Sequence, residues 1–433
     1  MAVFLPVNTD DQKPLTMASV SLSFKVHIPY RLKKFTPEAV GIYDSWLDEQ
    51  SCKSAVNKLA DECYLPTNMI ISSLINEQKG NFKVAFSFSG TVLELLQKHR
   101  PDVIKSFKLL VNTGCVEIFS ETYYHSLSWL HSTNEFKRQV QQHDELIKLL
   151  FGVEPSVFRN TELIYSNELA KFIAEMGYKG ILCEGLERIL NGRTPNQIYA
   201  APGNGDFGLL LRNVRLSDDI AFRFDDLTWN EQPLTAVKYA GWLHNQKENI
   251  YSVNLFFDYE TFGIHKTADT GIFEFLKHLP AAILADENWK FVTPSEVLEN
   301  CYPKDIYDVP NTISWEDKEM LSCVWSENVM QNNTLRKIYS LENMVNDSTM
   351  PGAMEWWGSL QSADHFYYMC NDGRTENDTY RLLNPFASGE EAFENYKNAV
   401  ADFEIKLIQR GLYDIKNKGL VNQVSKIFST MIY

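Results

Sequence analysis

The chain has 433 residues, of which 44% are hydrophobic and 22% are charged, so a large apolar core is available. Its formal net charge of −15 argues against nucleic-acid binding, because phosphate contacts require concentrated Lys and Arg, and it suits a neutral or cationic partner better. No apolar run approaches the ~20 residues that a membrane span needs. The length exceeds one ordinary compact domain but fits a barrel with a helical extension.

The cysteines indicate a reducing compartment. Seven are spread widely, their number is odd, and they form no C-x-x-C pair. This usage argues against a disulfide framework and against a structural zinc site. Residues 1–29 carry no basic region ahead of an apolar stretch, so we predict no signal peptide and expect the cytoplasm.

Apolar, strand-like segments alternate with amphipathic, helix-like ones after a leader at residues 1–20. The predicted strands are Ser21–His27, Lys83–Phe88, Cys115–Phe119, Val157–Asn160, Gly180–Cys183, Ala221–Phe224 and Tyr251–Phe257. The predicted helical stretches are Pro37–Ala60, Thr91–Thr113, Asn134–Phe151, Asn167–Met176 and Leu234–Lys247. This order predicts an α/β fold with a parallel sheet over residues 21–300, closed or nearly closed into a barrel with the helices outside. The strand count is one short of the usual eight-stranded barrel.

Two regions depart from the alternation. Leu186–Leu216 is rich in turn residues, which predicts a long loop or hairpin over the barrel mouth. After Thr293 and Pro294 the strand signals fade, and the sequence becomes helix-like from Trp315 onward. We therefore expect residues 301–433 to form a helical C-terminal region that contributes to the active-site cleft.

Acidic residues stand at the ends of several predicted strands. Asp258 ends the apolar run from Val253 to Phe257, and Glu162 follows the strand that begins at Val157. In β/α folds the C-terminal ends of the strands carry the chemistry, and two carboxylates there are the minimum for cleaving a glycosidic bond. Each acid taken singly is as well explained by capping of the next helix, but the set favours a catalytic role.

Other polar and aromatic residues are candidates for holding a sugar. His27 follows the first strand, although a lone His is more often structural. The segment from Ser120 to Trp129 includes His125 and would be expensive to bury without a polar ligand. A second dense cluster runs from Trp356 to Tyr368. No P-loop, G-x-G-x-x-G, G-x-S-x-G or H-E-x-x-H motif occurs and the nine His are scattered, so we predict neither a metal nor a cofactor.

Five short motifs between residues 21 and 370 resemble those of the family-57 glycoside hydrolases. They are His27-Ile28-Pro29 (the family has Gln in the middle), Gly114-Cys115-Val116-Glu117-Ile118, Arg159-Asn160-Thr161-Glu162-Leu163-Ile164-Tyr165, Phe257-Asp258-Tyr259-Glu260-Thr261-Phe262-Gly263 and Ser362-Ala363-Asp364-His365-Phe366. The block Tyr307-Asp308-Val309-Pro310 with Ile313-Ser314-Trp315 is similar to the α-amylase-like branch.

The resemblance implies a fold and a reaction. The family has an incomplete seven-stranded barrel followed by helices, and it cleaves α-1,4-glucosidic bonds with retention and without a catalytic metal. Glu162 matches its nucleophile and Asp258 its general acid/base, so their carboxyl groups should lie about 5–5.5 Å apart; a gap of ~6.5–9.5 Å would indicate inversion. We expect His27, Glu117, His125 and Asp364 to hold sugar hydroxyls and Trp129 and Trp357 to stack on sugar rings.

Three functions remain open at this point. Hydrolysis of an α-glucan or maltooligosaccharide, α-amylase-like, is the first. A 4-α-glucanotransferase or branching reaction uses the same residues and differs only in whether water or a sugar attacks the intermediate. A non-catalytic glucan-binding protein is the third, and the intact pair Glu162 and Asp258 argues against it.

Overall fold

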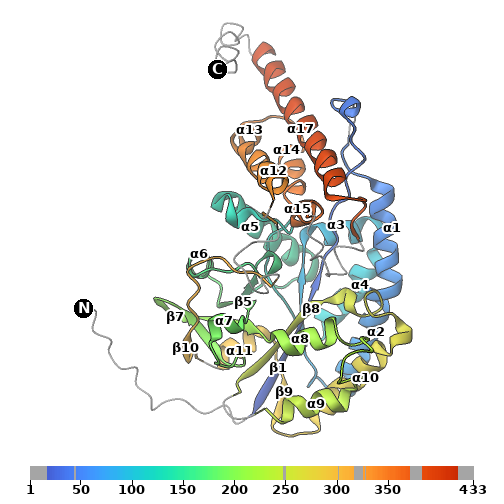
Figure 1. Ribbon diagram of the computed structural model, residues 1–433, viewed down its shortest axis with the longest axis vertical. Coiled ribbons are helices and arrows are strands. Elements are labelled where there is room, and N and C mark those ends of the chain that lie inside the picture. The colour runs from blue at the N-terminus through green and yellow to red at the C-terminus, as the bar shows by residue number, and fades with distance from the viewer. Residues whose placement is uncertain are drawn as a thin grey trace, which may run out of the picture.

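The computed structural model describes residues 17–42, 45–246, 250–300, 302–315, 325–326, 328–370 and 383–417. Most of the predicted leader, residues 1–16, lies outside this part of the chain. Figure 1 shows a barrel of strands wrapped by helices, with the C-terminal helices gathered beyond one end of the barrel.

Seven parallel strands form the barrel wall. They are β1 (Ala18–Val26), β2 (Val84–Phe88), β3 (Val116–Ile118), β4 (Val157–Arg159), β5 (Gly180–Glu184), β7 (Asn204–Arg212) and β8 (Ser252–Asp258). The strand β1 lies between β2 and β8, and β5 lies between β4 and β7. An isolated bridge between Ser120 and Phe158 joins the β3 and β4 sides, and one pair, Arg212 with Asn254, joins β7 to β8. The sheet is therefore not closed by a regular ladder, which confirms the predicted incomplete seven-stranded barrel.

One of the seven wall strands differs from the predicted set. Ala221–Phe224 is not a strand, because Ala221 ends the helix α8 (Val214–Ala221). The barrel strand β7 instead lies within the segment predicted as a loop or hairpin. It pairs antiparallel with β6 (Ile198–Ala201) through a turn at Pro202 and Gly203, where Gly203 has a φ of +75° that glycine adopts without strain. A hairpin is therefore present, but one of its strands belongs to the barrel wall and its turn lies at the N-terminal end of β7, away from the mouth over which it was predicted.

Helices follow the strands and cover the outside of the barrel. They are α1 (Glu49–Leu59), α2 (Leu65–Glu77), α3 (Gly90–His99), α4 (Pro101–Val111), α5 (Thr133–Phe151), α6 (Asn167–Glu175), α7 (Glu187–Leu190), α8, α9 (Ala236–His244), α10 (Ile272–Leu284) and α11 (Pro294–Asn300). The chain also forms a π-helical turn, η2 (Ala60–Tyr64), and the short 3₁₀ turns η1 (Pro37–Ala39), η3 (Ser128–Leu130), η4 (Thr161–Leu163), η5 (Tyr259–Thr261) and η6 (Ala268–Thr270). The predicted stretch Thr91–Thr113 is two helices, because Pro101 lacks the N–H that a continuous helix needs and begins α4 instead.

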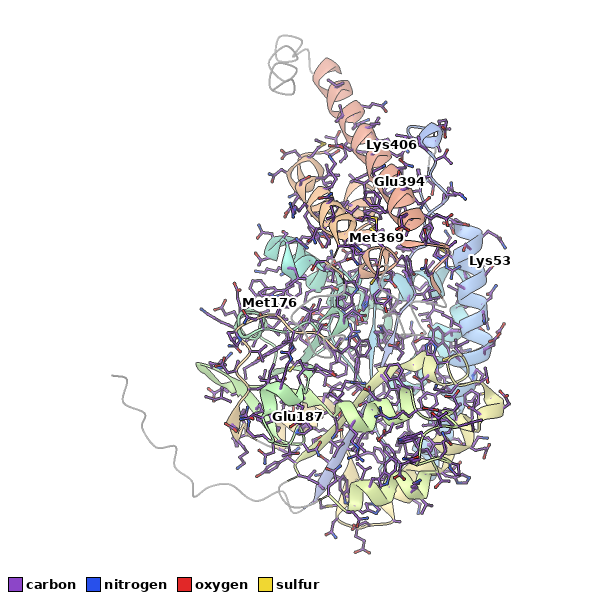
Figure 2. The ribbon with its side chains drawn as sticks, in the orientation of Figure 1. Lys53, Met176, Glu187, Met369, Glu394 and Lys406 are labelled. Atoms are coloured by element: carbon purple, nitrogen blue, oxygen red, sulfur yellow. The ribbon has the colours of Figure 1, made fainter. Side chains whose placement is uncertain are left out.

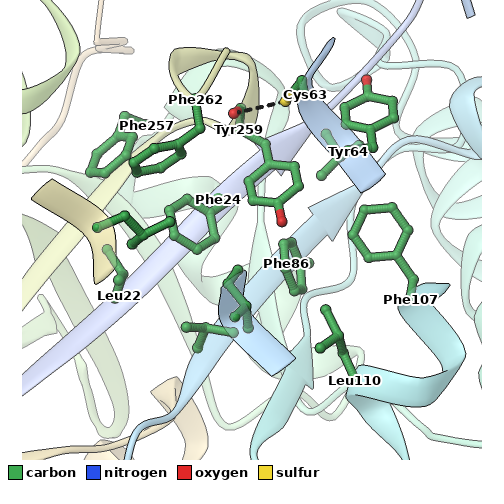
Figure 3. Packing of buried hydrophobic residues seen from close by; sticks show 14 of the residues in the cluster. Leu22, Phe24, Cys63, Tyr64, Phe86, Phe107, Leu110, Phe257, Tyr259 and Phe262 are labelled. Atoms are coloured by element: carbon green, nitrogen blue, oxygen red, sulfur yellow. Dashed lines mark hydrogen bonds between the residues drawn. The ribbon is translucent and has the colours of Figure 1, made fainter. Parts of the chain in front are cut away.

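Alternation along the strands separates an outer apolar face from an inner polar one. On β1, Val20, Leu22, Phe24 and Val26 pack outward with the helices, and Phe24 contacts Phe86 at 5.6 Å between ring centroids (Figure 3). Successive strand side chains point to opposite faces, so the intervening residues of β1 point into the barrel. Those residues are Ser19, Ser21, Ser23 and Lys25, all buried.

The barrel interior has an apolar floor beneath a polar layer. A small cluster, which includes Ala85, Leu182, Leu210 and Phe256, fills the interior. Above it, towards the C-terminal ends of the strands, Lys25 of β1 pairs in register with Asp258 of β8 and with Ser87 of β2. In-register neighbours on parallel strands place their side chains on the same face, so the pairing brings polar groups together inside the barrel.

The C-terminal helices pack at the end of the barrel to which the strands point (Figure 1). They are α12 (Val329–Ser340), α13 (Glu342–Asn346), α14 (Ala353–Ser359), α15 (Ala363–Tyr367) and α17 (Gly389–Asn417). Tyr396 of α17 donates a 2.6 Å hydrogen bond to the Leu360 carbonyl. Strand pairing continues slightly past residue 300, because β10 (Asp305–Ile306) pairs with β6; the short β9 (Trp289–Phe291) pairs with β1. Among the described residues, no helix has the length and apolarity to cross a bilayer.

Gly180 is required where β5 meets β7. A Cβ added there would overlap the carbonyl oxygen of Gly208 and approach Leu298 Cδ1 at 2.6 Å. We expect Gly180→Ala to lower the free energy of unfolding by about 1–3 kcal/mol, as overpacking does. Gly241→Ala on α9 is the control, since it meets nothing within 4 Å and should leave stability unchanged or raise it by roughly 0.5–1 kcal/mol. Urea unfolding measures both, and equal midpoints for the two variants would contradict the assignment.

Candidate active site

The two predicted catalytic carboxylates meet at the C-terminal end of the barrel. Asp258 is the last residue of β8 and is 8% exposed. Glu162 lies in the 3₁₀ turn η4 directly after β4 and is completely buried. Strands β4 and β8 are not neighbours, so the barrel geometry is what brings these residues together.

Glu162 has a strained backbone. Its φ of 53° and ψ of 30° are left-handed, and Leu163 follows with a φ of 52°. A non-glycine residue there is disfavoured by roughly 1–2 kcal/mol, so surrounding contacts must hold it. The backbone N–H of Trp315 donates to the Glu162 carbonyl at 3.3 Å, and Tyr165 exchanges hydrogen bonds with Ile313. Strain of this kind concentrates at functional sites, where it aims a side chain.

The Lys25 ammonium lies between the two carboxylates. Its Nζ is 3.2 Å from Glu162 Oε1 and 3.0 Å from Asp258 Oδ1. These two oxygens therefore lie at most about 6 Å apart, so a single ammonium links the two carboxylates. Burial disfavours the ammonium, but the Asp258 and Glu162 charges outweigh it and raise the pKa of Lys25.

Both oxygens of Glu162 are held by donors. His125 Nε2 is 2.6 Å from Oε1, and the indole N–H of Trp315 donates to Oε2 at 2.6 Å. Burial alone would raise the pKa of Glu162, but Lys25 and His125 hold it well below its ordinary value. Glu162 is therefore ionised at neutral pH, which is the form that acts as a nucleophile.

A second buried ion pair, Glu121 with Arg159, contacts His125 on the side of the ring away from Glu162. Glu121, in the loop after β3, is 3.1 Å from the Arg159 guanidinium of β4, accepts from the Ser87 hydroxyl, and lies 3.5 Å from His125 Nδ1. Burial opposes its charge, but Arg159 and His125 hold the pKa of Glu121 well below its usual range. Burial also disfavours charge on His125, yet Glu121 and Glu162 raise its pKa, so the ring is held between two carboxylates.

His27 and Asp364 join the barrel to the C-terminal helices. His27 Nε2 lies 2.9 Å from Asp364 Oδ2, and its Nδ1 lies 2.7 Å from the Ser89 hydroxyl. The His27 ring stacks on His125 with 4.1 Å between centroids. Asp364 lies on α15, so the helical region reaches His27, whose ring stacks on His125, the histidine that contacts Glu162. The structure thus brings His27, His125 and Asp364 together beside the carboxylate pair.

A cavity of about 1210 Å³ opens next to Asp258. Its wall includes Trp315, Arg212, Glu184 and Glu187 of α7, the short helix that follows β5 (Figure 2). Arg212 donates to Glu184 at 3.0 Å, and its guanidinium lies 5.6 Å from the Trp315 ring centroid. Among the described residues, no group of three or more His, Cys, Asp and Glu side chains is arranged to hold a metal ion.

Three predicted sugar-binding residues lie elsewhere. Glu117 accepts two 2.9 Å hydrogen bonds from the backbone N–H and hydroxyl of Ser295, so it caps the start of α11. Trp129 packs against the rings of Phe136 and Phe172. Trp357 is fully buried and donates to the Ile338 carbonyl at 2.8 Å. None of the three lines the cavity next to Asp258.

Sequence reasoning missed Lys25, Arg159 and Trp315 as site residues. A signal for Lys25 was present, because it continues the polar alternation of Ser19, Ser21 and Ser23 and therefore points into the barrel. Arg159 occupies an inward position of β4 in the same way. Trp315 stands in the block that resembles the α-amylase-like branch, but its contact with Glu162 depends on how residues 302–315 return to the barrel mouth.

The ion pair between Glu121 and Arg159 should stabilise the fold strongly. Glu121→Gln leaves a buried guanidinium without its counter-charge, so we expect a loss of roughly 3–5 kcal/mol of unfolding free energy at pH 7. The folded-state pKa of Glu121 is depressed, so its contribution is present above the ordinary Glu pKa of ~4.3 and fades as pH falls below it. Urea unfolding at pH 7 and at pH 4 checks both statements. Glu154→Gln removes an exposed pair with Lys148 and should change little; a similar effect of both variants would refute the prediction.

Comparison with known proteins agrees with this geometry. A family model described as glycosyl hydrolase family 57 matches residues 21–310. The chain is 36% identical over 414 residues to the Methanocaldococcus jannaschii protein named "Putative alpha-amylase", covering 92% of this chain and 87% of that one. It is 24% identical to an alpha-amylase of Pyrococcus abyssi, over 57% of this chain and 37% of that protein.

Two solved structures share the fold. The 4-alpha-glucanotransferase of Thermococcus litoralis matches with a TM-score of 0.65 and 16% identity, over 88% of this chain and 59% of that chain. The GH57 branching enzyme of Thermococcus kodakaraensis matches with a TM-score of 0.64 and 14% identity, over 89% of each chain. On the family match and the 36% identity over most of its length, the chain belongs to glycosyl hydrolase family 57.

Proposed function

We propose that this protein cleaves α-1,4-glucosidic bonds in α-glucans or maltooligosaccharides with retention of configuration. Glu162 is the nucleophile and Asp258 is the general acid/base. The observation that carries the proposal is that the chain places these two carboxylates, one at the end of β8 and one just after β4, against the same ammonium.

The reaction has two displacements. A Glu162 oxygen bonds to the anomeric carbon while the bond to the glycosidic oxygen breaks and Asp258 gives that oxygen its proton. Asp258, now a carboxylate, takes a proton from water, whose oxygen displaces Glu162 and restores the α configuration. The ionised state of Glu162, which Lys25 and His125 favour, supports its role in the first step.

The cavity and the relatives support an α-glucan as the substrate. At about 1210 Å³ the cavity exceeds the ~300–1,000 Å³ typical of sites for drug-sized molecules, so it has room for several sugar units. The relatives named alpha-amylases support this substrate class. His27, His125 and Asp364 are the hydroxyl partners that we retain, because they adjoin the pair. A cytoplasmic location is supported by the free thiols of the five described cysteines.

Glu162→Gln should abolish turnover and leave the fold intact. The amide is not a nucleophile, so we expect kcat on maltoheptaose to fall by roughly 10³-fold or more. Glu168→Gln, which alters an exposed carboxylate at the start of α6, is the matched control and should keep full activity. Appreciable activity in a folded Glu162→Gln protein would show that the nucleophile is another residue.

Product analysis on maltoheptaose separates hydrolysis from transfer. We expect shorter sugars alone, and ¹H NMR at early times should show the α-anomer of the new reducing end. Longer sugars beside shorter ones would make the protein a transferase with the same catalytic pair. A β-anomer as first product would contradict retention, and no products from folded protein would favour a glucan-binding role.

A further inference from the structure

Lys25 is a buried cation in contact with both catalytic carboxylates. Its side chain is 2% exposed, and its Nζ lies 4.7 Å from the centroid of the Trp315 ring, so the ammonium is enclosed between that ring and the two carboxylates. A lysine at this depth costs several kcal/mol in lost hydration unless it is paired. The double displacement described above assigns it no step.

The strand register fixes where the ammonium sits. Lys25 pairs in register with Asp258 on β8, and it follows three inward-facing serines on β1. Its aromatic neighbour Phe24, on the opposite face, packs against Phe257 at 5.5 Å and Tyr259 at 5.1 Å between centroids. The outer packing therefore holds β1 and the end of β8 rigidly, and it aims Lys25 and Asp258 at each other.

We propose that Lys25 is a positioning residue that holds Glu162 and Asp258 in register with each other and sets the pH range in which the pair works. This inference rests on the proposed function of the pair. The ammonium favours the charged form of Glu162, so it helps the nucleophile, and its 3.0 Å contact holds Asp258 beside that residue.

The same cation helps later in the cycle. When Glu162 forms its ester with the sugar and Asp258 has given its proton to the leaving oxygen, one negative charge remains beside the ammonium. Lys25 then stabilises Asp258 as a carboxylate, the form that accepts the proton of water. When that proton has moved and the ester bond breaks, the ammonium stabilises the Glu162 carboxylate that forms again. Lys25 keeps its own proton throughout.

Other charged and titratable groups surround these three side chains. Arg159 of β4 and His125 of the loop after β3 act on Glu162, and Arg159 opposes the charge of Lys25. On the β8 side, Glu260 of η5 accepts from Tyr64 of η2 at 2.6 Å, and burial and Asp258 raise the pKa of Glu260. Replacing Lys25 leaves all of these groups in place, so the change isolates the ammonium.

The test is the pH dependence of kcat/KM on maltoheptaose for Lys25→Met. Without the ammonium Glu162 binds a proton more readily, so the acidic limb of the profile, which requires ionised Glu162, should move to higher pH by about one to three units. Lys25→Arg keeps a cation and should keep the acidic limb near its wild-type pH even if kcat falls. Lys53→Met, on the exposed surface of α1 (Figure 2), is the control and should shift nothing.

Two results would overturn the proposal. A folded Lys25→Met protein whose rate falls while the acidic limb stays in place would give Lys25 a purely structural role. A Lys25→Arg protein whose acidic limb moves as far upward as that of Lys25→Met would show that the charge is not what matters. If the methionine variant fails to fold, Lys25→Gln, which also lacks the charge, takes its place in both comparisons.

A second measurement needs no substrate and separates this proposal from the proposed function. Lys25→Met leaves Glu162 and Asp258 buried without their ammonium, so its urea midpoint at pH 7 should lie below that of the wild type. The depressed pKa of Glu162 contributes stability above the ordinary Glu pKa of ~4.3, and this contribution fades as pH falls. The gap should therefore keep its size from pH 7 down to pH ~4.3 and narrow below that pH, where urea midpoints at pH 4 and pH 3 measure it. A gap that is independent of pH would contradict the proposal, whatever the substrate proves to be.

Discussion

The arrangement of the site depends on burying opposite charges together inside the barrel. Lys25, Glu162 and Asp258 are almost completely removed from water, and each one alone would be strongly destabilising there. The Lys25 ammonium lies 3.2 Å from Glu162 and 3.0 Å from Asp258, and these contacts offset the cost of burying the three charges. Glu121 and Arg159 repeat the arrangement one layer behind, with His125 between the two groups. Each of these carboxylates has a cationic neighbour, and this pairing allows Glu162 to stay ionised although its side chain is fully buried.

The outer face of the barrel provides the rigidity that this balance requires. Phe24, Phe86 and Tyr259 interlock on the side of the strands away from the site (Figure 3). Because side chains alternate along a strand, every outward aromatic fixes the direction of its inward neighbour. Misplacing an ammonium by an ångström would expose the carboxylates to each other's repulsion. Apolar packing on the outer face of the strands therefore fixes the positions of the charged side chains on the inner face.

The helical region completes the site from outside the barrel. Asp364 of α15 orients His27, which stacks on His125, which in turn contacts Glu162. Trp315 reaches the same carboxylate from the segment that leads out of the barrel, and its backbone helps to hold the left-handed turn at Glu162. The barrel and the helical region are thus joined through Glu162, and the two histidines link α15 to this residue.

The sequence by itself determined the barrel class, six of its seven strands, and the carboxylates at the ends of β4 and β8, because alternation and strand-end acids are local patterns. It missed β7, since the glycines and turn residues around Gly203 resemble a loop and only pairing with β5 makes Leu209–Leu211 a wall strand. From the sequence we expected Glu117, Trp129 and Trp357 to contact the sugar, whereas in the folded protein Glu117 caps α11 and the two tryptophans pack in the core. Only the tertiary structure decided that Lys25 stands between Glu162 and Asp258, because that contact joins three strands through register and barrel curvature, which no local pattern encodes.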